Sequence, residues 1–194
     1  MNAGFPSDVL LKKEEFVVRY GTYSEFWSHH TADVREGYLP TLQGYLSELA
    51  KLAHADAQQF DADHLVANQQ GKPRKIKLSP DELEVKRAGL FLAAAQWYEE
   101  IIVTFPEDPR TAEYLFLLGE SYTEAHELGR AVAAYQRVVR DFPDYINADE
   151  AGYAAILGLT ALVATADAAE LELWQRLKID AQIEFSKKSH AGAD

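Results

Sequence analysis

The sequence predicts an all-α protein, and three observations lead to that fold class. Helix-starting signals recur along the chain, apolar residues return at steps of three and four, and strand signals are nearly absent. No Asn-Gly or Asp-Gly hairpin dipeptide occurs, and no alternating apolar–polar run is longer than a few residues. The chain of 194 residues, 47% hydrophobic and 26% charged, has the composition of one folded domain or two small ones.

Five segments carry helix-start signals. Ser79-Pro80-Asp81-Glu82 combines a serine N-cap, a proline at the first helical position and a glutamate three residues after the cap. The same cap-x-x-Glu form returns at residues 22–25, 147–150 and 167–170, and Asp108-Pro109 predicts a further capped start. Such caps stabilise a helix because its first turn leaves backbone amides without partners.

A pair of antiparallel helices is predicted between residues 111 and 142, joined by a turn around Leu128-Gly129. The two helices are antiparallel because the turn is short, and Gly119 and Ala131 are small enough for close contact. Each segment has one apolar face, formed by Leu115, Leu118, Gly119 and Tyr122 in the first and by Ala131, Tyr135, Val138 and Phe142 in the second.

The chain contains an internal repeat. Residues 97–106 match residues 134–143 at a shift of 37. Downstream, residues 114–119 match residues 153–158, and Tyr135 matches Trp174, both at a shift of 39. A repeat of this length that holds one helix pair is typical of a helical solenoid.

The best repeat resembles a known family. Leu115-x2-Leu118-Gly119-x2-Tyr122, followed by Ala131-x3-Tyr135 and Pro143, is similar to the tetratricopeptide repeat (TPR), with Leu115 in place of Trp and Tyr135 in place of Phe. The resemblance covers residues 89–162 and implies a TPR-like right-handed solenoid of antiparallel helix pairs. The repeated Phe-Pro endings resemble TPR units of bacterial envelope proteins of the outer-membrane assembly lipoprotein and Tol–Pal coordinator types.

This resemblance implies a function and a location. We expect a non-catalytic scaffold that mediates protein–protein interaction in bacterial envelope assembly or maintenance. The expected location is the periplasm or the outer membrane, with the cytoplasm as the alternative. The resemblance also leaves open a longer natural protein with a signal sequence.

The domain organisation follows from the positions of these motifs. Residues 1–40 are predicted to form an N-terminal helical extension, and residues 41–190 about three TPR-like helix pairs, the first beginning with a helix over residues 41–60. Residues 67–79 are predicted to be an exposed basic insert, because they are polar and contain Gly, Pro and four basic side chains.

Composition excludes several function classes. The formal net charge of −12 opposes binding to nucleic acid or anionic lipid. The longest uncharged run, residues 151–166, is shorter than the ~20 apolar residues of a membrane span. There is no cysteine, phosphate loop, dinucleotide fingerprint or nucleophile elbow, so neither an enzyme nor a cofactor is predicted.

Two polar clusters could hold a metal ion, and we interpret both as surface residues. The first places Glu25, His29 and Asp33 at steps of four on a predicted helix, with His30 and Glu36 nearby. The second contains His54, Asp56, Asp61, Asp63 and His64. Neither has a paired-His helix signature, and a metal-dependent enzyme at His29 stays the least favoured alternative.

The predicted partner-binding residues lie on the concave face of the central repeat. On the first helix, the side away from the packing face carries Glu113, Phe116, Glu120, Thr123 and Glu124. An acidic surface with an exposed Phe116 favours a protein or peptide partner that is basic or amphipathic. The alternative is a self-associating module, a homodimer formed through uncapped terminal repeats.

Overall fold

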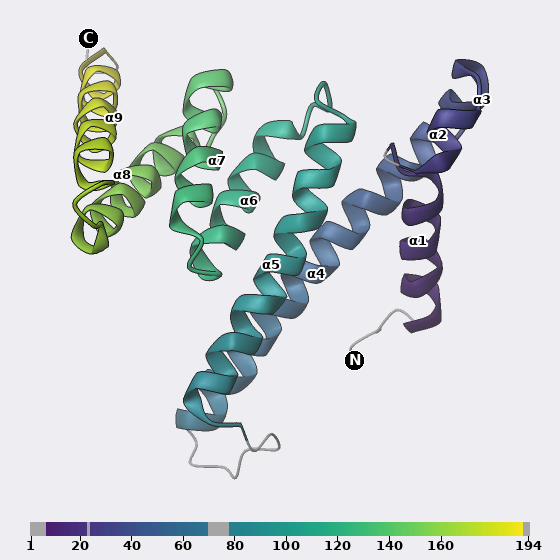
Figure 1. Ribbon diagram of the computed structural model, residues 1–194, viewed down its shortest axis with the longest axis horizontal. Helices are drawn as coiled ribbons and strands as arrows, with labels where there is room; N and C mark the ends of the chain where they lie inside the picture. The colour runs from purple at the N-terminus through teal and green to yellow at the C-terminus, as the bar shows by residue number, and fades with distance from the viewer. Residues whose placement is uncertain (1–6, 23, 70–77, 192–194) are drawn as a thin grey trace. The chain divides into compact units, whose positions relative to one another are not determined.

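The computed structural model describes residues 7–22, 24–69 and 78–191, and every secondary-structure element within them is an α-helix (Figure 1). The all-α prediction is confirmed. The chain divides into two compact units, Met1–Asp108 and Pro109–Asp194. The division therefore falls within the predicted run of helix pairs, and the predicted extension over residues 1–40 belongs to the same unit as the first pair. No helix in the described ranges is long and apolar enough to cross a membrane.

The first unit is built on a long helix pair. Helices α4 (Leu39–Gln69) and α5 (Pro80–Thr104) lie side by side and run in opposite directions (Figure 1). The helix predicted over residues 41–60 is therefore present and longer than expected. Residues 67–69 are helical rather than part of an exposed insert, and residues 70–77 of that insert lie outside the described residues. Fully buried side chains between the two helices include Leu42, Leu46, Ala94, Tyr98 and Ile101.

Three shorter helices precede this pair: α1 (Ser7–Tyr20), α2 (Glu25–His29) and α3 (Ala32–Glu36). Helix α1 packs against α4, with Val17 buried and Lys13 ion-paired to Glu48. The aromatic rings of Tyr20 and Tyr38 stack at 4.8 Å between centroids, which ties the end of α1 to the start of α4. The predicted additional N-terminal helices are thus part of the first unit's packing.

The second unit consists of α6 (Thr111–Glu124), α7 (Leu128–Asp141), α8 (Ala148–Thr165) and α9 (Leu171–Ala191). Each helix packs on the next one in sequence, and α6 also contacts α8. The predicted α6–α7 pair is present. The core of the second unit includes Tyr114, Leu115 and Tyr122 of α6, Val138 of α7 and Leu159 of α8, all nearly or fully buried.

The turn between α6 and α7 lies earlier than predicted. Residues 125–127 form it, and Gly129 is inside α7. His126 adopts a φ of 61°, Glu127 N–H donates to the Tyr122 carbonyl, and His126 N–H donates to the Thr123 carbonyl. These two bonds form a Schellman motif, which satisfies the last carbonyls of α6 and removes the need for a glycine-centred turn.

Two of the five predicted helix starts have the predicted side-chain cap, at Ser79 and Asp167. Ser79 and Glu82 form a complete capping box, and Asp167 accepts hydrogen bonds from Ala169 N–H and Glu170 N–H. Helix α2 is preceded by Ser24 and not by the predicted cap Thr22, and Ser24 makes no side-chain cap bond. Asn147, which precedes α8, makes none either.

The prediction of a capped start at Asp108-Pro109 is wrong, because α6 begins at Thr111 after Arg110. The Oδ2 atom of Asp108 accepts a hydrogen bond of 2.7 Å from Gln43 Nε2 of α4. The side chain that the sequence pattern assigned to a cap therefore makes a tertiary contact.

The 37-residue repeat is visible in the backbone. Phe105 ends α5 with φ −129° and ψ 65°, and Phe142 ends α7 with φ −136° and ψ 56°. Each of the two accepts a backbone hydrogen bond from the residue three positions later, Asp108 or Tyr145. The matching sequences therefore end their helices in the same way.

The predicted 39-residue shift between α6 and α8 is wrong. It aligns the buried residues Tyr114 and Leu118 with Tyr153 and Leu157, which are 56% and 53% exposed. A shift of 37 instead aligns buried positions with buried positions. These pairs are Thr111 with Ala148, Tyr114 with Ala151, Leu115 with Gly152, Leu118 with Ala155, and Tyr122 with Leu159.

Candidate binding surface

The predicted partner-binding residues are all on α6, but they differ in accessibility. Thr123 is exposed, Glu113, Glu120 and Glu124 are half-buried, and Phe116 is buried at 7% exposure. The expectation of an exposed Phe116 is wrong. Its ring lies against those of Tyr135 and Tyr145, with centroids 5.9 and 6.3 Å away, so it supports the surface from below.

Carboxylates from two helices gather above this aromatic layer. Glu120 of α6 is partly buried, and both that burial and the nearby charge of Glu150 of α8 raise its pKa. Neither Glu120 nor Glu150 forms an ion pair with any described residue. The second unit therefore keeps like charges close together, an arrangement that costs folding free energy.

Tyr145, in the connection between α7 and α8, lies within the same electrostatic field. Burial, followed by the charge of Glu113 and the weaker influence of Glu120 and Glu150, raises the pKa of its phenol. The side chain of Asn147 lowers this pKa in opposition to the carboxylates, and Asn147 makes no side-chain cap bond to α8. Glu113 and Glu120 of α6 and Glu150 of α8 thus act on one phenol, although they come from two helices.

Tyr135 of α7 lies deeper in the same region. Burial is the largest cause that raises the pKa of Tyr135 to about 12, and the charges of Glu120 and Glu150 act in the same direction. Thr123 hydrogen-bonds the Tyr135 side chain and donates its own hydroxyl to the Gly119 carbonyl at 2.9 Å. Tyr135 stays a neutral phenol at physiological pH and serves as a packing residue.

Helix α8 extends this surface with residues that the sequence analysis missed. At the 37-residue shift, Glu150 corresponds to Glu113, and Tyr153 corresponds to Phe116. Tyr153 and Leu157 follow Glu150 at steps of three and four, so all three lie on one face of α8. The correct repeat shift would have found them, since it places each at a partner-binding position of the preceding unit.

We define the acidic face as the surface that these α6 and α8 positions form with the intervening Tyr145. It combines carboxylates with two exposed apolar side chains, and the aromatic rings of Phe116 and Tyr135 lie beneath it. Its members are Glu113, Glu120, Thr123, Glu124, Tyr145, Glu150, Tyr153 and Leu157.

The first predicted metal cluster is not assembled on one helix. Helices α2 and α3 are separated by His30 and Thr31, so Glu25, His29 and Asp33 do not share a helical face. The Nδ1 atom of His29 lies 2.7 Å from the Glu25 carbonyl oxygen, and the His30 ring stacks on Phe26. Within the described parts of the chain, no group of three or more His, Asp and Glu side chains could hold a metal ion.

The second cluster separates in the same way. His54 is buried against the rings of Phe91 and Tyr98, and its Nε2 atom lies 3.1 Å from Gln58 Nε2. Burial lowers the pKa of the His54 imidazole. Asp56 is exposed, while the side chains of Asp61, Asp63 and His64 lie outside the described residues. His54 is therefore a core residue.

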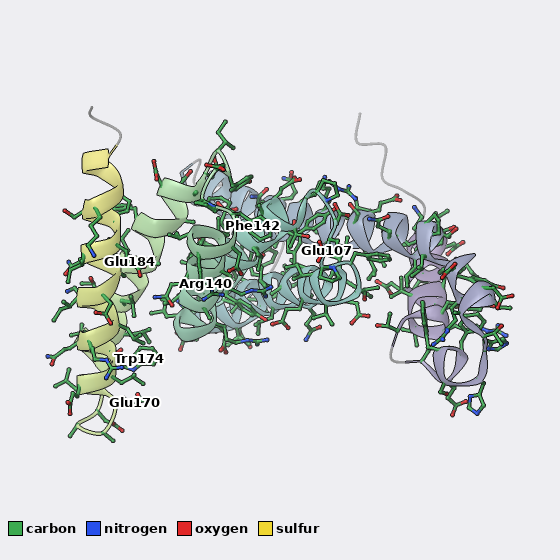
Figure 2. The ribbon with its side chains drawn as sticks, turned by 90° about the horizontal axis from the view of Figure 1, so that it is seen from above. Glu107, Arg140, Phe142, Glu170, Trp174 and Glu184 are labelled. Carbon is green, nitrogen blue, oxygen red and sulfur yellow. The ribbon has the colours of Figure 1, made fainter. Side chains whose placement is uncertain are left out.

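Helices α7, α8 and α9 enclose a separate hollow of about 290 Å³. Its edge includes Arg140 of α7 and Glu184 of α9, which Figure 2 labels. Arg140 donates to the carboxylate of its neighbour Asp141 at 2.8 Å. A Cβ on Gly152 would lie 3.0 Å from the Phe185 ring, so this glycine allows α9 to pack closely on α8.

The predicted match of Trp174 to Tyr135 is not accompanied by equal burial. Tyr135 is buried, as is Tyr98 of α5, whereas Trp174, near the start of α9, is half-buried (Figure 2). Helix α9 begins at Leu171, six residues later than a 37-residue shift from the start of α7 would place it. The second helix of the last pair therefore departs from the repeat.

Comparison with protein-family models, curated proteins and solved structures gives no match to this chain. The acidic face is consequently interpreted from its own chemistry. Grouped carboxylates beside exposed apolar side chains can attract a cation over a distance and bind an apolar group on contact.

Proposed function

We propose that this protein is a non-catalytic scaffold of TPR-like helix pairs that binds a basic, amphipathic protein segment on its acidic face. The observation that carries the proposal is the accumulation of Glu113, Glu120 and Glu150 around one tyrosine, Tyr145. A cationic partner would relieve the repulsion between Glu120 and Glu150. Selection for stability alone would not favour such an arrangement.

The exposed apolar residues determine the second half of the recognition. Tyr153 and Leu157 are more than half exposed and lie next to Glu150 on α8. A partner helix with basic residues beside an apolar stripe would neutralise the carboxylates and bury both side chains. The charges would mainly accelerate association, and the apolar contacts would mainly slow dissociation.

The proposed setting is bacterial envelope assembly or maintenance, in the periplasm or at the outer membrane. Its support is the resemblance of the repeated Phe-Pro helix ends, which share one backbone conformation at Phe105 and Phe142. A cytoplasmic location is the alternative. Localisation of the tagged natural protein by cell fractionation tests this part independently of the binding site.

Binding kinetics of a defined probe test the proposed interaction. The probe is a synthetic amphipathic helix of Leu and Lys residues, and its negative control replaces each Lys by Glu. We expect the variant Glu113→Gln/Glu120→Gln/Glu150→Gln to associate more slowly with the Lys peptide and to show a weaker salt dependence. Equal rates and salt slopes for this variant and the wild type would contradict the proposal.

A matched control distinguishes the effect of the charges on the acidic face from the effect of the protein's net charge. Glu127→Gln/Glu170→Gln/Glu172→Gln removes the same number of charges from exposed positions of the same unit. We expect this control to retain most of the salt dependence. If both triple variants lose it equally, net charge and not the acidic face attracts the peptide.

The apolar contacts need their own pair of variants. We expect Tyr153→Ala/Leu157→Ala to increase the dissociation rate about tenfold or more, because it removes two contact side chains. The control is Ile179→Ala/Ile183→Ala, which truncates two similarly exposed apolar residues on α9. Its dissociation rate should match that of the wild type.

Self-association is a second candidate function, favoured by α9. Leu173, Ile179 and Ile183 of this helix are about half exposed. A second copy of the chain could cover them, since stacked terminal helices close a solenoid. Light scattering of the wild type and of Ile179→Ala/Ile183→Ala tests this, and a concentration-independent monomeric mass for the wild type would exclude it.

A further inference from the structure

A cavity of about 340 Å³ lies in the first unit, and no residue of the acidic face lines it. It opens between the end of α1 and the C-terminal half of α5. Its walls combine apolar and polar side chains, namely Val17, Val18, Gly21, Ser24, Gln96, Trp97 and Glu100. This mixture of an apolar wall with a few convergent polar groups is typical of small-ligand sites.

Two of the polar groups lack the partners that a purely structural role would supply. The Oγ atom of Ser24 is buried and has no hydrogen-bond partner among the described residues. The carboxylate of Glu100 accepts one long hydrogen bond, 3.4 Å from Thr104 Oγ1, and forms no ion pair with a described residue. Burial raises the pKa of the Glu100 carboxyl. The cavity therefore presents acceptors to which the protein supplies no cation.

The helical repeat does not require these side chains. At the 37-residue shift, Trp97 corresponds to Ala134 and Glu100 to Arg137, while Tyr98 and Tyr135 are both buried between them. The buried tyrosine is thus present in both repeats, whereas the residues on either side of it differ. Trp97 and Glu100 are specific to the helix that lines the cavity.

We propose that this cavity binds a primary ammonium group carried on a short apolar stem. An ammonium group has three N–H donors and no acceptor, which fits the Glu100 carboxylate, the Ser24 hydroxyl and the Gln96 amide oxygen. The indole of Trp97 attracts a cation through its ring face and also contacts an apolar stem. Val17 and Val18 complete the apolar wall.

The cavity volume limits the size of the ligand. It lies at the lower end of the roughly 300–1,000 Å³ that ligand pockets occupy. A lysine side chain of a peptide and a free small amine both fit this limit. These two sources share one chemistry, and different probes distinguish them.

Titration of the full chain with three probes tests the proposal. The probes are phenethylamine, N-acetyl-lysine methylamide and the uncharged 2-phenylethanol, and the readout is the indole N–H resonance of Trp97 in NMR spectra. The Trp97→Phe variant assigns that resonance among the three tryptophans. We expect at least one amine to shift it, with about tenfold or greater preference over the alcohol.

The relative affinities of the two amines show whether the ammonium group belongs to a peptide lysine or to a free small amine. Binding of the lysine derivative as tightly as phenethylamine supports a peptide lysine, and binding of phenethylamine alone supports a free amine. If neither amine binds, or if the alcohol binds as tightly as the amines, the proposal is overturned.

Variants then locate the ammonium group. We expect Glu100→Gln to weaken amine binding about tenfold and to leave alcohol binding unchanged, and Ser24→Ala to weaken amine binding severalfold. Glu100→Gln keeps the shape of the side chain, and a thermal melt checks its folding. Asp56→Asn, on the exposed side of α4, is the charge control and should bind like the wild type. Unchanged amine affinity in Glu100→Gln would overturn the proposal.

Discussion

Gly119 and Tyr135 are in direct contact across the α6–α7 pair. A Cβ atom placed on Gly119 would lie 2.5 Å from Cε1 and 2.7 Å from Cδ1 of the Tyr135 ring. Carbon atoms do not approach so closely without displacement of one of them. Because the Tyr135 ring is buried, it has little room to move, and the contact defines how near the two helices come.

We therefore expect Gly119→Ala to lower the free energy of unfolding by ~1–3 kcal/mol, and Gly119→Leu by at least as much. Denaturant unfolding followed by circular dichroism measures the change. The control is Gly89→Ala in α5, where an added Cβ meets no atom within 4 Å. That change should stabilise the protein by about 0.5–1 kcal/mol, because alanine favours a helix over glycine. A Gly119→Ala variant as stable as the wild type would contradict the contact.

Phe116→Ala should destabilise the protein, in contrast to the expectation for an exposed binding residue. Phe116 is buried against Tyr135 and Tyr145, and truncation of a buried phenylalanine costs about 3–5 kcal/mol. The equivalent Tyr153→Ala should change stability by about 0.5 kcal/mol or less, because Tyr153 is exposed. Unfolding of both variants under identical conditions compares them. Equal stability of the two variants would show that Phe116 is not a core residue.

Glu120→Gln should stabilise the protein at neutral pH. Burial and the charge of Glu150 raise the pKa of Glu120 in the folded state, so the folded protein holds this proton more tightly than the unfolded chain. Stability therefore falls as the pH rises from the ordinary carboxyl pKa through the raised value. Glutamine removes this loss, and the advantage of the variant should shrink as the pH is lowered toward 4.

Unfolding curves at several pH values measure this effect, with Glu127→Gln at an exposed position as the control. A Glu120→Gln variant that is less stable than the wild type at neutral pH would show that Glu120 is not held in an unfavourable charged state. The same substitution should weaken peptide binding, which would place stability and function in opposition at one residue.

Acid should weaken the first unit through His54. Burial lowers the pKa of this imidazole, so the unfolded chain binds the proton more readily than the folded protein. The stability that neutral His54 provides is present above its unfolded pKa, near 6.5, and is lost as the pH falls through the lower folded value.

We expect His54→Leu to show a flatter dependence of stability on pH between about 7 and 5. Thermal unfolding across this range is the measurement, and His29→Leu, at an exposed position, is the control. If His54→Leu keeps the wild-type pH dependence, another group is responsible for the acid sensitivity.

Helix content and the first two repeated units could be predicted because their signals are local. The capping box at Ser79 and Glu82 needs only four residues, and the helix ends at Phe105 and Phe142 need only the Phe-Pro sequence. The close contact of Gly119 also followed from its place on an apolar helical face. Interactions over short distances along the chain determine each of these features.

The register of α8 could not be read from residue types, because its buried positions are occupied by small residues. Ala151, Gly152 and Ala155 stand where α6 has Tyr114, Leu115 and Leu118. Matching by side-chain type selected Tyr153 and Leu157 instead, and it placed two surface residues in the core. The error of two residues concealed the three α8 residues of the acidic face, Glu150, Tyr153 and Leu157.

By itself, the sequence determined that this chain is helical, that α5 begins after Ser79, that α5 and α7 end at Phe-Pro sequences, and which residues of α6 are acidic. Only the tertiary structure decided that Phe116 is buried, that Asp108 bonds Gln43, and that Glu120 and Glu150 share one surface. The physical reason is the distance along the chain over which each kind of interaction acts. Capping and helical periodicity act within about one turn, whereas burial and charge proximity depend on neighbours supplied by distant parts of the chain.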